Sequence, residues 1–280
     1  MSRALNIVPE YPPAGGKNAF RPFDLVVGDP GQRLILFCDH ARNALPPDYR
    51  DLGLCREALK RHIAYDIGAE LITRQLAALT GASAALALFS RLLIDPNRGE
   101  DDPTLVMRIS DRALIPGNAR IGADEIEHRL EHYWRPYRAA CANLIDSTLA
   151  RGMIPALLGL HSFTPCFHGH ARPWQIGVLW DKDPRLALPL IDALRADGLV
   201  VGDNEPYDGA LRGDSMYDHS TRRGLPGALI EIRQDLVETP QHCAAWAERL
   251  ARILAPILAR PEMRRIVFHG SRTAPERPPA

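Results

Sequence analysis

The segment LILFCDHARN, residues 34–43, begins with five apolar residues and turns abruptly polar at Asp39 and His40. A continuous apolar run of this length is typical of a parallel strand that is buried on both faces of a sheet. In open α/β sheets, ligands bind beyond the carboxyl ends of such strands. The segment therefore predicts an α/β fold in which His40 lies at the edge where a site forms.

The same pattern recurs three more times along the chain. The further segments are LALFSRLLI at residues 86–94, PALLGLH at residues 155–161 and ALIEI at residues 228–232. The first runs into the tetrapeptide DPNR at residues 95–98, the second ends in His161, and the third carries Glu231. Because the carboxyl ends of parallel strands meet at one edge of a sheet, these polar residues predict an active site there.

The composition is that of an ordinary globular protein and argues against two classes of partner. Of the 280 residues, 46% are hydrophobic and 24% charged, and Lys+Arg and Asp+Glu are equal at 34 each. Without net charge, no long-range field favours nucleic acid or an anionic membrane. No apolar run approaches the roughly 20 residues of a membrane span, and the N-terminus lacks the apolar core of a signal peptide. The five scattered cysteines favour free thiols in a cytoplasmic protein.

The chain divides into an arm, one domain and a tail. Residues 1–22 hold four prolines and a Gly-Gly pair, which predict an irregular N-terminal arm. Residues 23–268 show neither an internal repeat nor a linker, so we interpret them as one domain. Residues 269–280 predict a flexible tail. The sequence leaves the oligomeric state open.

Two helical patterns and two long polar loops lie between the expected strands. Residues 56–79 have apolar residues at helical spacing, with Asp66 on or beside the apolar face. A buried carboxylate needs a partner, so Asp66 is either structural, as an ion pair or a cap, or functional. Residues 123–150 predict a helix that Pro136 kinks or divides in two. The loops at residues 99–121 and 202–223 are long enough to be functional.

His40 and His161 are a candidate pair of metal ligands, because each follows or closes a separate strand. Neutral imidazole is the commonest zinc ligand, and a hydrolytic zinc site uses about three protein ligands with an open position for water. The alternative is that each histidine only hydrogen-bonds a neighbouring carbonyl.

The motifs around these residues carry a family resemblance that spans residues 34–259. In chain order they are HARN, HIAYDIGAE, SRLLIDPNR, LHSFTP, RPWQIGVLWD, DNEPYDG and GALIEIRQDL. Their order resembles that of the N-formylglutamate amidohydrolase family. The chain is more distantly similar to zinc carboxypeptidases and aspartoacylase-type deacylases. In those proteins a strand-end His-x-x-Glu and a later His-Ser hold the metal, and an Asp-x-Asn-Arg segment binds the substrate carboxylate.

The resemblance implies a fold and a reaction. The fold is a single α/β domain, residues 23–268, with a mixed, mainly parallel sheet flanked by helices, similar to zinc exopeptidases. The activity is zinc-dependent hydrolysis of the amide of an N-acyl amino acid, a small molecule with a carboxylate. N-formyl-L-glutamate is the family substrate, and its products, formate and glutamate, place the reaction in histidine breakdown.

The chain departs from the distant relatives at the third metal ligand. Their His-x-x-Glu corresponds here to His40 and Asn43, and an amide is a poor zinc ligand compared with a carboxylate. We therefore take His40, His161 and Asp66 as the candidate ligands for one zinc ion (Zn2+). Asn43, through its carbonyl oxygen or as a residue behind the ligands, remains an alternative.

The resemblance also assigns roles to the residues near the metal. Glu231 would act as the general base that takes a proton from water and passes it to the leaving amine. In the alternating sequence of residues 230–233, Glu231 and Arg233 share one face, which we expect to point to the rim. Asp95 would accept the far N–H of His40 and so fix its tautomer.

The substrate would be held by three residues and its oxyanion by two more. Asn97, Arg98 and Arg91 would bind the carboxylate, because a planar guanidinium matches it in bidentate fashion. Tyr217 and His219 are candidate donors to the developing oxyanion. The structural alternatives are internal salt bridges from Arg91 and Arg98 to residues 95 and 100–102, and a pairing of Glu231 with Arg233 or Arg91.

Two rival functions belong to other classes. The chain could be a related hydrolase, such as an N-acetyl or N-succinyl deacylase or a small carboxypeptidase. It could instead be a catalytically silent binder of an acidic metabolite, since Asn43 stands where the distant relatives have a ligand.

Overall fold

A seven-stranded sheet organises the molecule, whose computed structural model describes residues 20–273. The strand order is β1-β3-β2-β6-β11-β9-β10. The strands are β1 (Phe23–Val26), β2 (Leu34–Cys38), β3 (Ser83–Ala87), β6 (Ala156–Phe163), β9 (Ile176–Leu179), β10 (Val201–Asp203) and β11 (Gly227–Arg233). Two short hairpins lie outside the sheet: β4 (Ile109–Ser110) with β5 (Ala113–Leu114), and β7 (Cys166–Phe167) with β8 (His170–Ala171).

The four central strands are parallel, and the pairing changes at both sides of them. β2 pairs in parallel with β3 and β6, and β6 pairs in parallel with β11. β1 is antiparallel to β3, while β9 is antiparallel to β11 and parallel to β10. The predicted mixed, mainly parallel sheet is therefore confirmed. Its consequence for function is that the carboxyl ends of β2, β3, β6 and β11 meet at one edge.

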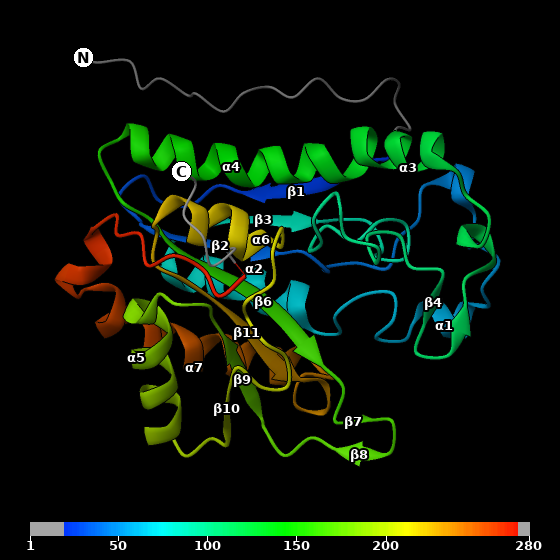
Figure 1. Ribbon diagram of the computed structural model, residues 1–280. Helices are drawn as coiled ribbons and strands as arrows, with labels where there is room; N and C mark the ends of the chain where they lie inside the picture. Colours follow the sequence, from blue (N-terminus) through cyan, green and yellow to red (C-terminus); the bar gives the residue numbers. More distant parts are fainter. Residues whose placement is uncertain (1–19, 274–280) are drawn as a thin grey trace.

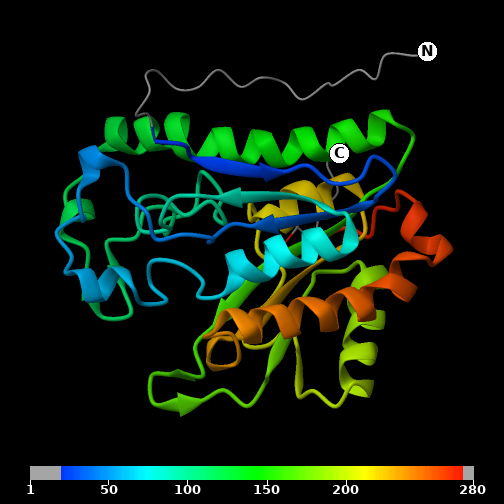
Figure 2. The same cartoon turned by 180° about the vertical axis from the view of Figure 1, so that it is seen from behind.

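Helices cover both faces of this sheet, in three layers (Figures 1 and 2). One face carries α2 (Ala69–Thr80), α5 (Pro184–Ala196) and α7 (Pro240–Leu258), and the other carries α3 (Ala123–Arg129), α4 (Arg135–Ala150) and α6 (Ser215–His219). A short helix, α1 (Arg56–Leu59), precedes α2. The remaining turns are η1 (Pro47–Tyr49), η2 (Pro116–Asn118), η3 (Leu130–Trp134), η4 (Thr221–Arg223), η5 (Gln234–Leu236) and η6 (Pro261–Arg264).

The alternation of side chains along each strand builds two cores. Leu34, Leu36 and Cys38 of β2 pack on the side of α2 and α7, whereas Ile35 and Phe37 pack on the side of α4. All five are almost completely buried, which is why the run is apolar without interruption. Odd-numbered positions of β6 and β11 share the α4 side, so His161 and Glu231 point to that layer.

The predicted helix over residues 56–79 is wrong in its middle. The chain leaves α1 at Leu59 and enters α2 only at Ala69. Gly68 has a positive φ of 82°, and a Cβ there would come within 2.8 Å of Val237; both conditions require glycine. Asp66 therefore lies in the segment before α2 and not on a helical face.

Two further predicted elements are shorter than expected. The strand expected over residues 86–94 ends at Ala87, because Ser90 turns the chain by donating hydrogen bonds to the carbonyls of Ala44 and Ala64. The helix over residues 123–150 is divided by the π-helical turn η3, directly before Pro136. A proline has no N–H to donate to the preceding turn, so the division at Pro136 agrees with the sequence.

Other expectations concern thiols, membranes and the ends of the chain. All five cysteines are free thiols, as expected. No helix within residues 20–273 is long and apolar enough to cross a membrane. Most of the predicted arm and tail, residues 1–19 and 274–280, lies outside the described residues.

Candidate metal centre and active site

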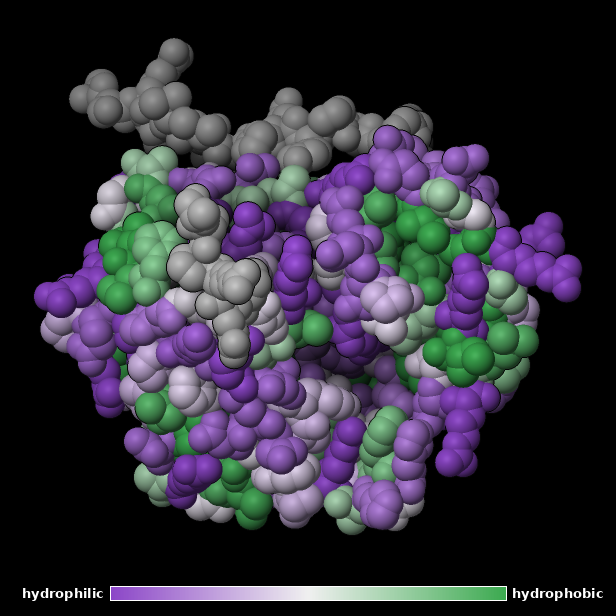
Figure 3. All heavy atoms as spheres, in the orientation of Figure 1, coloured by the Kyte–Doolittle hydropathy of each residue, from purple (hydrophilic) through white to green (hydrophobic). Residues whose placement is uncertain are grey.

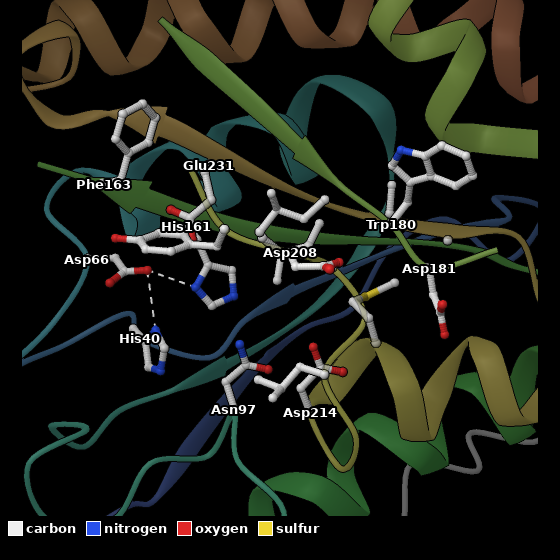
Figure 4. Close-up of a pocket in the computed structure, with 18 of the residues that line it drawn as sticks. His40, Asp66, Asn97, His161, Phe163, Trp180, Asp181, Asp208, Asp214 and Glu231 are labelled. Carbon is white, nitrogen blue, oxygen red and sulfur yellow. Dashed lines mark hydrogen bonds and ion pairs between the residues drawn. The ribbon is translucent and has the colours of Figure 1, made fainter. Parts of the chain in front are cut away.

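Two histidines and one aspartate converge at the carboxyl edge of the sheet (Figure 4). Oδ2 of Asp66 lies 3.3 Å from Nδ1 of His40 and 2.8 Å from Nδ1 of His161. The three ligand atoms lie within 4.8 Å of one another, and all three residues are buried. His40 follows β2, His161 belongs to β6, and Asp66 comes from the segment before α2.

Backbone contacts hold Asp66 in this position. Its N–H donates to the carbonyl of His40 at 2.9 Å. The N–H of Ser162 donates to its Oδ2 at 3.3 Å, and the Ser162 hydroxyl donates to the carbonyl of Ile67 at 2.8 Å. The His-Ser pair therefore supplies a side chain to the cluster and also anchors the segment that supplies the third member.

A carboxylate holds the far nitrogen of each imidazole. Nε2 of His40 lies 2.7 Å from Oδ1 of Asp95, the arrangement that the family resemblance implies. Nε2 of His161 lies 3.1 Å from Oδ2 of Asp39. Sequence reasoning gave Asp39 no role, although it directly precedes His40. The other oxygen of Asp39 accepts from the hydroxyls of Tyr137 and Ser215, at 2.9 and 2.6 Å.

The charges of this cluster fit a cation. Burial alone would raise the pKa of Asp39, but the hydrogen bond and charge of His161 lower it to about 2. Burial would likewise lower the pKa of His161, yet Asp39 and Asp66 raise it well above its usual range. Each ring thus has a carboxylate at both nitrogens. A neutral imidazole has a single N–H and can donate a hydrogen bond to only one of them. A metal ion at the two Nδ1 atoms would replace the extra protons and leave each Nε2–H to its aspartate.

The residues present therefore fit a divalent metal. Two imidazole nitrogens and one carboxylate oxygen are the donor types of hydrolytic zinc sites. Four carboxylates, those of Asp39, Asp66, Asp95 and Glu231, gather around the cluster. The guanidinium of Arg91 lies among these carboxylates. It donates two hydrogen bonds to Asp95, at 3.1 and 2.7 Å, and lies 3.7 Å from Asp66.

Glu231 adds a carboxylate that is free for chemistry. It belongs to β11, between Ile230 and Ile232, which pack in the opposite core. Its Oε2 is buried and has no hydrogen-bond partner within residues 20–273. Burial raises the pKa of Glu231 to about 7, against the lowering effect of His161. Arg233, its expected structural partner, bonds Asp235 and three backbone carbonyls instead.

The cluster opens into a cavity of about 260 Å³. Figure 3, drawn in the orientation of Figure 1, shows a hollow near the middle of this face. The residues that border the hollow are mainly hydrophilic. The predicted site residues that line the cavity are His40, Asp66, Arg91, Asn97, Arg98, His161 and Glu231. The cavity is therefore where seven of the residues chosen from sequence come together.

Three predicted residues are placed elsewhere. Asn43 donates its amide to the carbonyl of Leu59 and is not among the residues that line the cavity. Neither Tyr217 nor His219 of α6 lines it. His219 is buried against Phe37, and this burial lowers its pKa to about 3. These positions argue against Asn43 as a metal ligand, and against direct contact of Tyr217 or His219 with a substrate in the cavity.

A different tyrosine, Tyr207, does line the cavity. Its hydroxyl accepts a bond of 3.0 Å from Arg172, whose guanidinium also lies over the Tyr207 ring. The segment DNEPYDG that contains Tyr207 was recognisable as a motif, but nothing in the sequence distinguished Tyr207 from Tyr217 as the residue that faces the site.

Replacing Asp39 by asparagine is expected to lower metal affinity about 10- to 100-fold, the usual effect of removing the partner of a metal-binding histidine. The amide keeps the size of Asp39 but can present its N–H₂ to His161, which favours the wrong tautomer. Competition with a chelator measures the affinity. The matched control is Asp203→Asn, at an exposed position of β10; equal affinity in both variants would show that Asp39 does not position His161.

The mainly parallel sheet and the buried donor set at its carboxyl edge define an α/β protein with a candidate metal centre of the hydrolytic type. The comparison with protein families agrees with this class. The model of N-formylglutamate amidohydrolase matches residues 32–238, which is most of the chain. The chain belongs to the N-formylglutamate amidohydrolase family.

Solved structures show the same fold. The gene product Atu2144 from Agrobacterium tumefaciens is 30% identical, with a TM-score of 0.82 over 86% of this chain and 96% of that chain. N-formylglutamate amidohydrolase from Ralstonia eutropha JMP134 is 22% identical, with a TM-score of 0.65 over 84% and 96% of the two chains. The second likeness concerns the fold alone. Among curated proteins, no sequence matches this chain.

Proposed function

We propose that this protein is a metal-dependent amidohydrolase that cleaves the amide of an N-acyl amino acid. The observation that carries the proposal is the buried cluster of His40, Asp66 and His161, which opens into a cavity beside the unpartnered carboxylate of Glu231. The family makes N-formyl-L-glutamate the reference substrate, with formate and glutamate as products.

The proposed chemistry divides between a metal ion and the chain. A divalent ion such as zinc, held by His40, Asp66 and His161, supplies Lewis acidity for water and for the amide carbonyl. Glu231 takes a proton from the attacking water and returns it to the leaving nitrogen. A pKa near 7 suits both steps, because the same carboxyl must accept and then donate a proton. Asp95 and Asp39 keep the two imidazoles in one orientation.

The substrate carboxylate is assigned to the arginine side of the cavity. Arg98 lines the cavity, while its Nη1 donates to the carbonyl of Asn97 at 2.8 Å. Internal salt bridges are the structural alternative for both arginines. Arg91 bonds Asp95 at 2.7 Å, whereas Arg98 approaches Asp102 only to 4.0 Å, so the alternative describes the main contact of Arg91. The side-chain oxygen of Asn97 accepts from the N–H of Ser215 at 3.0 Å, which leaves its amide group to bind substrate. Arg98 is therefore the principal carboxylate ligand in the proposal.

Metal analysis and one substrate panel test this function together. Purified protein should contain about one zinc or another divalent ion per chain, and should hydrolyse N-formyl-L-glutamate with release of formate. N-acetyl and N-succinyl glutamate, assayed beside it, separate a formyl hydrolase from the related deacylases. Metal without hydrolysis of any panel member would favour the silent binder of an acidic metabolite.

A further inference from the structure

The cavity extends well beyond the metal centre. Along β11, the residues that line it run from Glu231 back through Leu229 to Gly227. The four steps from Gly227 to Glu231 span about 13 Å at roughly 3.3 Å per residue. A formyl group adds a single carbon to the amide, so it cannot fill this recess, which we define as the part of the cavity between Leu229 and Asp181.

Part of the cavity lining is apolar. Leu179 on β9, Leu211 before α6, Met216 on α6 and Leu229 on β11 all line the cavity. Contact with such a surface favours a hydrocarbon chain, because each buried methylene contributes about 0.8 kcal/mol, a factor of about four in affinity.

The far end of the recess is acidic. Figure 4 shows Asp181 and Trp180 at the end opposite to the cluster of His40, Asp66 and His161. Asp181 and Asp208 both line the cavity. They share one cation, Arg272, which bonds Asp181 Oδ1 at 3.3 Å and the two oxygens of Asp208 at 2.6 and 3.0 Å. Asp181 and Asp208 carry two negative charges and Arg272 one positive charge, so within the described residues this group has one carboxylate in excess.

One oxygen at this end lacks a partner altogether. Oδ2 of Asp181 is buried, and no described residue donates a hydrogen bond to it. The Asp181 side chain as a whole is only 5% exposed. A buried carboxylate oxygen without a donor is expensive. The neighbouring Asp183, in contrast, is matched by Arg185 at 2.5 Å. Apart from Glu231 at the metal centre, Asp181 is therefore the cavity residue whose buried carboxylate oxygen has no donor within residues 20–273.

We propose that this recess is a specificity subsite for an aliphatic chain that ends in a cationic group, such as an ammonium. The inference rests on the proposed amide hydrolysis, since the recess opens onto the same metal centre, and it names the substrate class. The hydrocarbon lies against Leu179, Leu211, Met216 and Leu229, and the cation bonds Asp181. A chain that ends in a carboxylate, like the side chain of glutamate, meets the same negative charge unfavourably.

The cationic chain can come from either side of the scissile amide, and two substrate series separate these sources. The first series varies the amino acid: the N-formyl derivatives of norleucine, lysine and α-aminoadipate. The second varies the acyl group: caproyl, ε-aminocaproyl and adipoyl glycine. In the series that enters the recess, kcat/KM should follow the order ammonium, methyl, carboxylate, with about a tenfold or greater gain from methyl to ammonium. The other series should show no such order.

Two variants locate the effect within the recess. Asp181→Asn keeps an oxygen to accept from Arg272 and should abolish the preference for ammonium over methyl. Leu211→Trp should fill the recess and lower the ratio of long-chain to N-formylglycine turnover about tenfold or more. The matched control is Leu188→Trp, whose parent side chain is 41% exposed on α5 and does not line the cavity. Metal content and thermal melting show that each variant folds.

A binding measurement tests the recess without any turnover. Trp180 lines the recess, so titration with ε-aminocaproate should change tryptophan fluorescence, and the change should be lost in Trp180→Phe. Caproate should bind about tenfold more weakly and adipate more weakly still. A preference for adipate, or equal binding of all three acids, would overturn the subsite. Failure of hydrolysis with intact ε-aminocaproate binding would instead overturn the proposed reaction alone.

Discussion

Replacing Glu231 by glutamine is expected to lower kcat roughly 100-fold or more while the protein retains its metal and its KM. The reason is chemical, because glutamine keeps the size and the hydrogen-bonding atoms of Glu231 but cannot take a proton from water. General acid–base groups contribute about 10²- to 10⁴-fold. Steady-state assays on N-formyl-L-glutamate or the best substrate of the panel, with metal analysis of the same sample, measure the two effects separately.

Two observations would contradict this role. Loss of the metal in Glu231→Gln would identify Glu231 as a ligand, and turnover close to that of the parent would make it structural. The matched control is Glu248→Gln, at an exposed position of α7, which should behave like the parent. Structural damage is a minor concern, because Oε2 of Glu231 has no partner to lose within residues 20–273.

The pH dependence gives a second signature of Glu231. Its pKa is raised to about 7 by burial, so the carboxylate that accepts a proton is lost as the pH falls below that value. In the parent, kcat/KM should therefore decline on the acid side with an apparent pKa near 7. Glu231→Gln should lose this acid limb, and its low residual rate should vary little over the same range.

The sheet edge and much of the site could be predicted from the sequence for one physical reason. Apolar runs such as residues 34–38 are long enough to identify buried strands, and the first polar residue after each run marks the carboxyl end. His40, His161 and Glu231 can therefore be assigned to one edge without any knowledge of distant contacts. The alternation along β11 is equally local, and it gives the face of Glu231 directly.

What could not be predicted depends on contacts between residues far apart in the chain. Asp39 is recognisable only through its bonds to Tyr137, His161 and Ser215, which lie 98, 122 and 176 residues away. The interruption between α1 and α2 follows from the bond of Asp66 to the carbonyl of His40, whereas the local apolar spacing favours one continuous helix.

The choice of tyrosine failed for a related reason. Residues 202–223 carry no long periodic pattern, so the sequence gives no face for either Tyr207 or Tyr217. Close packing distinguishes the two tyrosines in the structure. A Cβ on Gly209 would lie 2.1 Å from the backbone of Trp180, so this part of the loop lies directly against the end of β9. That approach directs Tyr207 to the cavity, while Tyr217 belongs to the short helix α6.

Removing either histidine of the cluster is expected to abolish metal binding and activity. His40→Ala and His161→Ala each delete one of three donors, which should weaken metal affinity by more than about 100-fold. Asp66→Asn should also weaken it, because an amide is a poorer ligand than a carboxylate. Metal content after dialysis and chelator competition measure these losses, and activity should fall in parallel and return in part at high metal concentration for Asp66→Asn.

Replacing His161 by alanine is expected to lower the stability of the protein as well as its metal affinity. His161 lies between Asp39 and Asp66, so its removal takes one partner from each of two buried carboxylates, and breaking such a buried pair costs about 3–5 kcal/mol. His161→Asn retains a polar side chain between them and should fold better while still losing the metal. His128→Ala, at an exposed position of α3, is the matched control and should bind metal like the parent. Full metal occupancy in a folded His40 or His161 variant would move the metal centre away from this cluster.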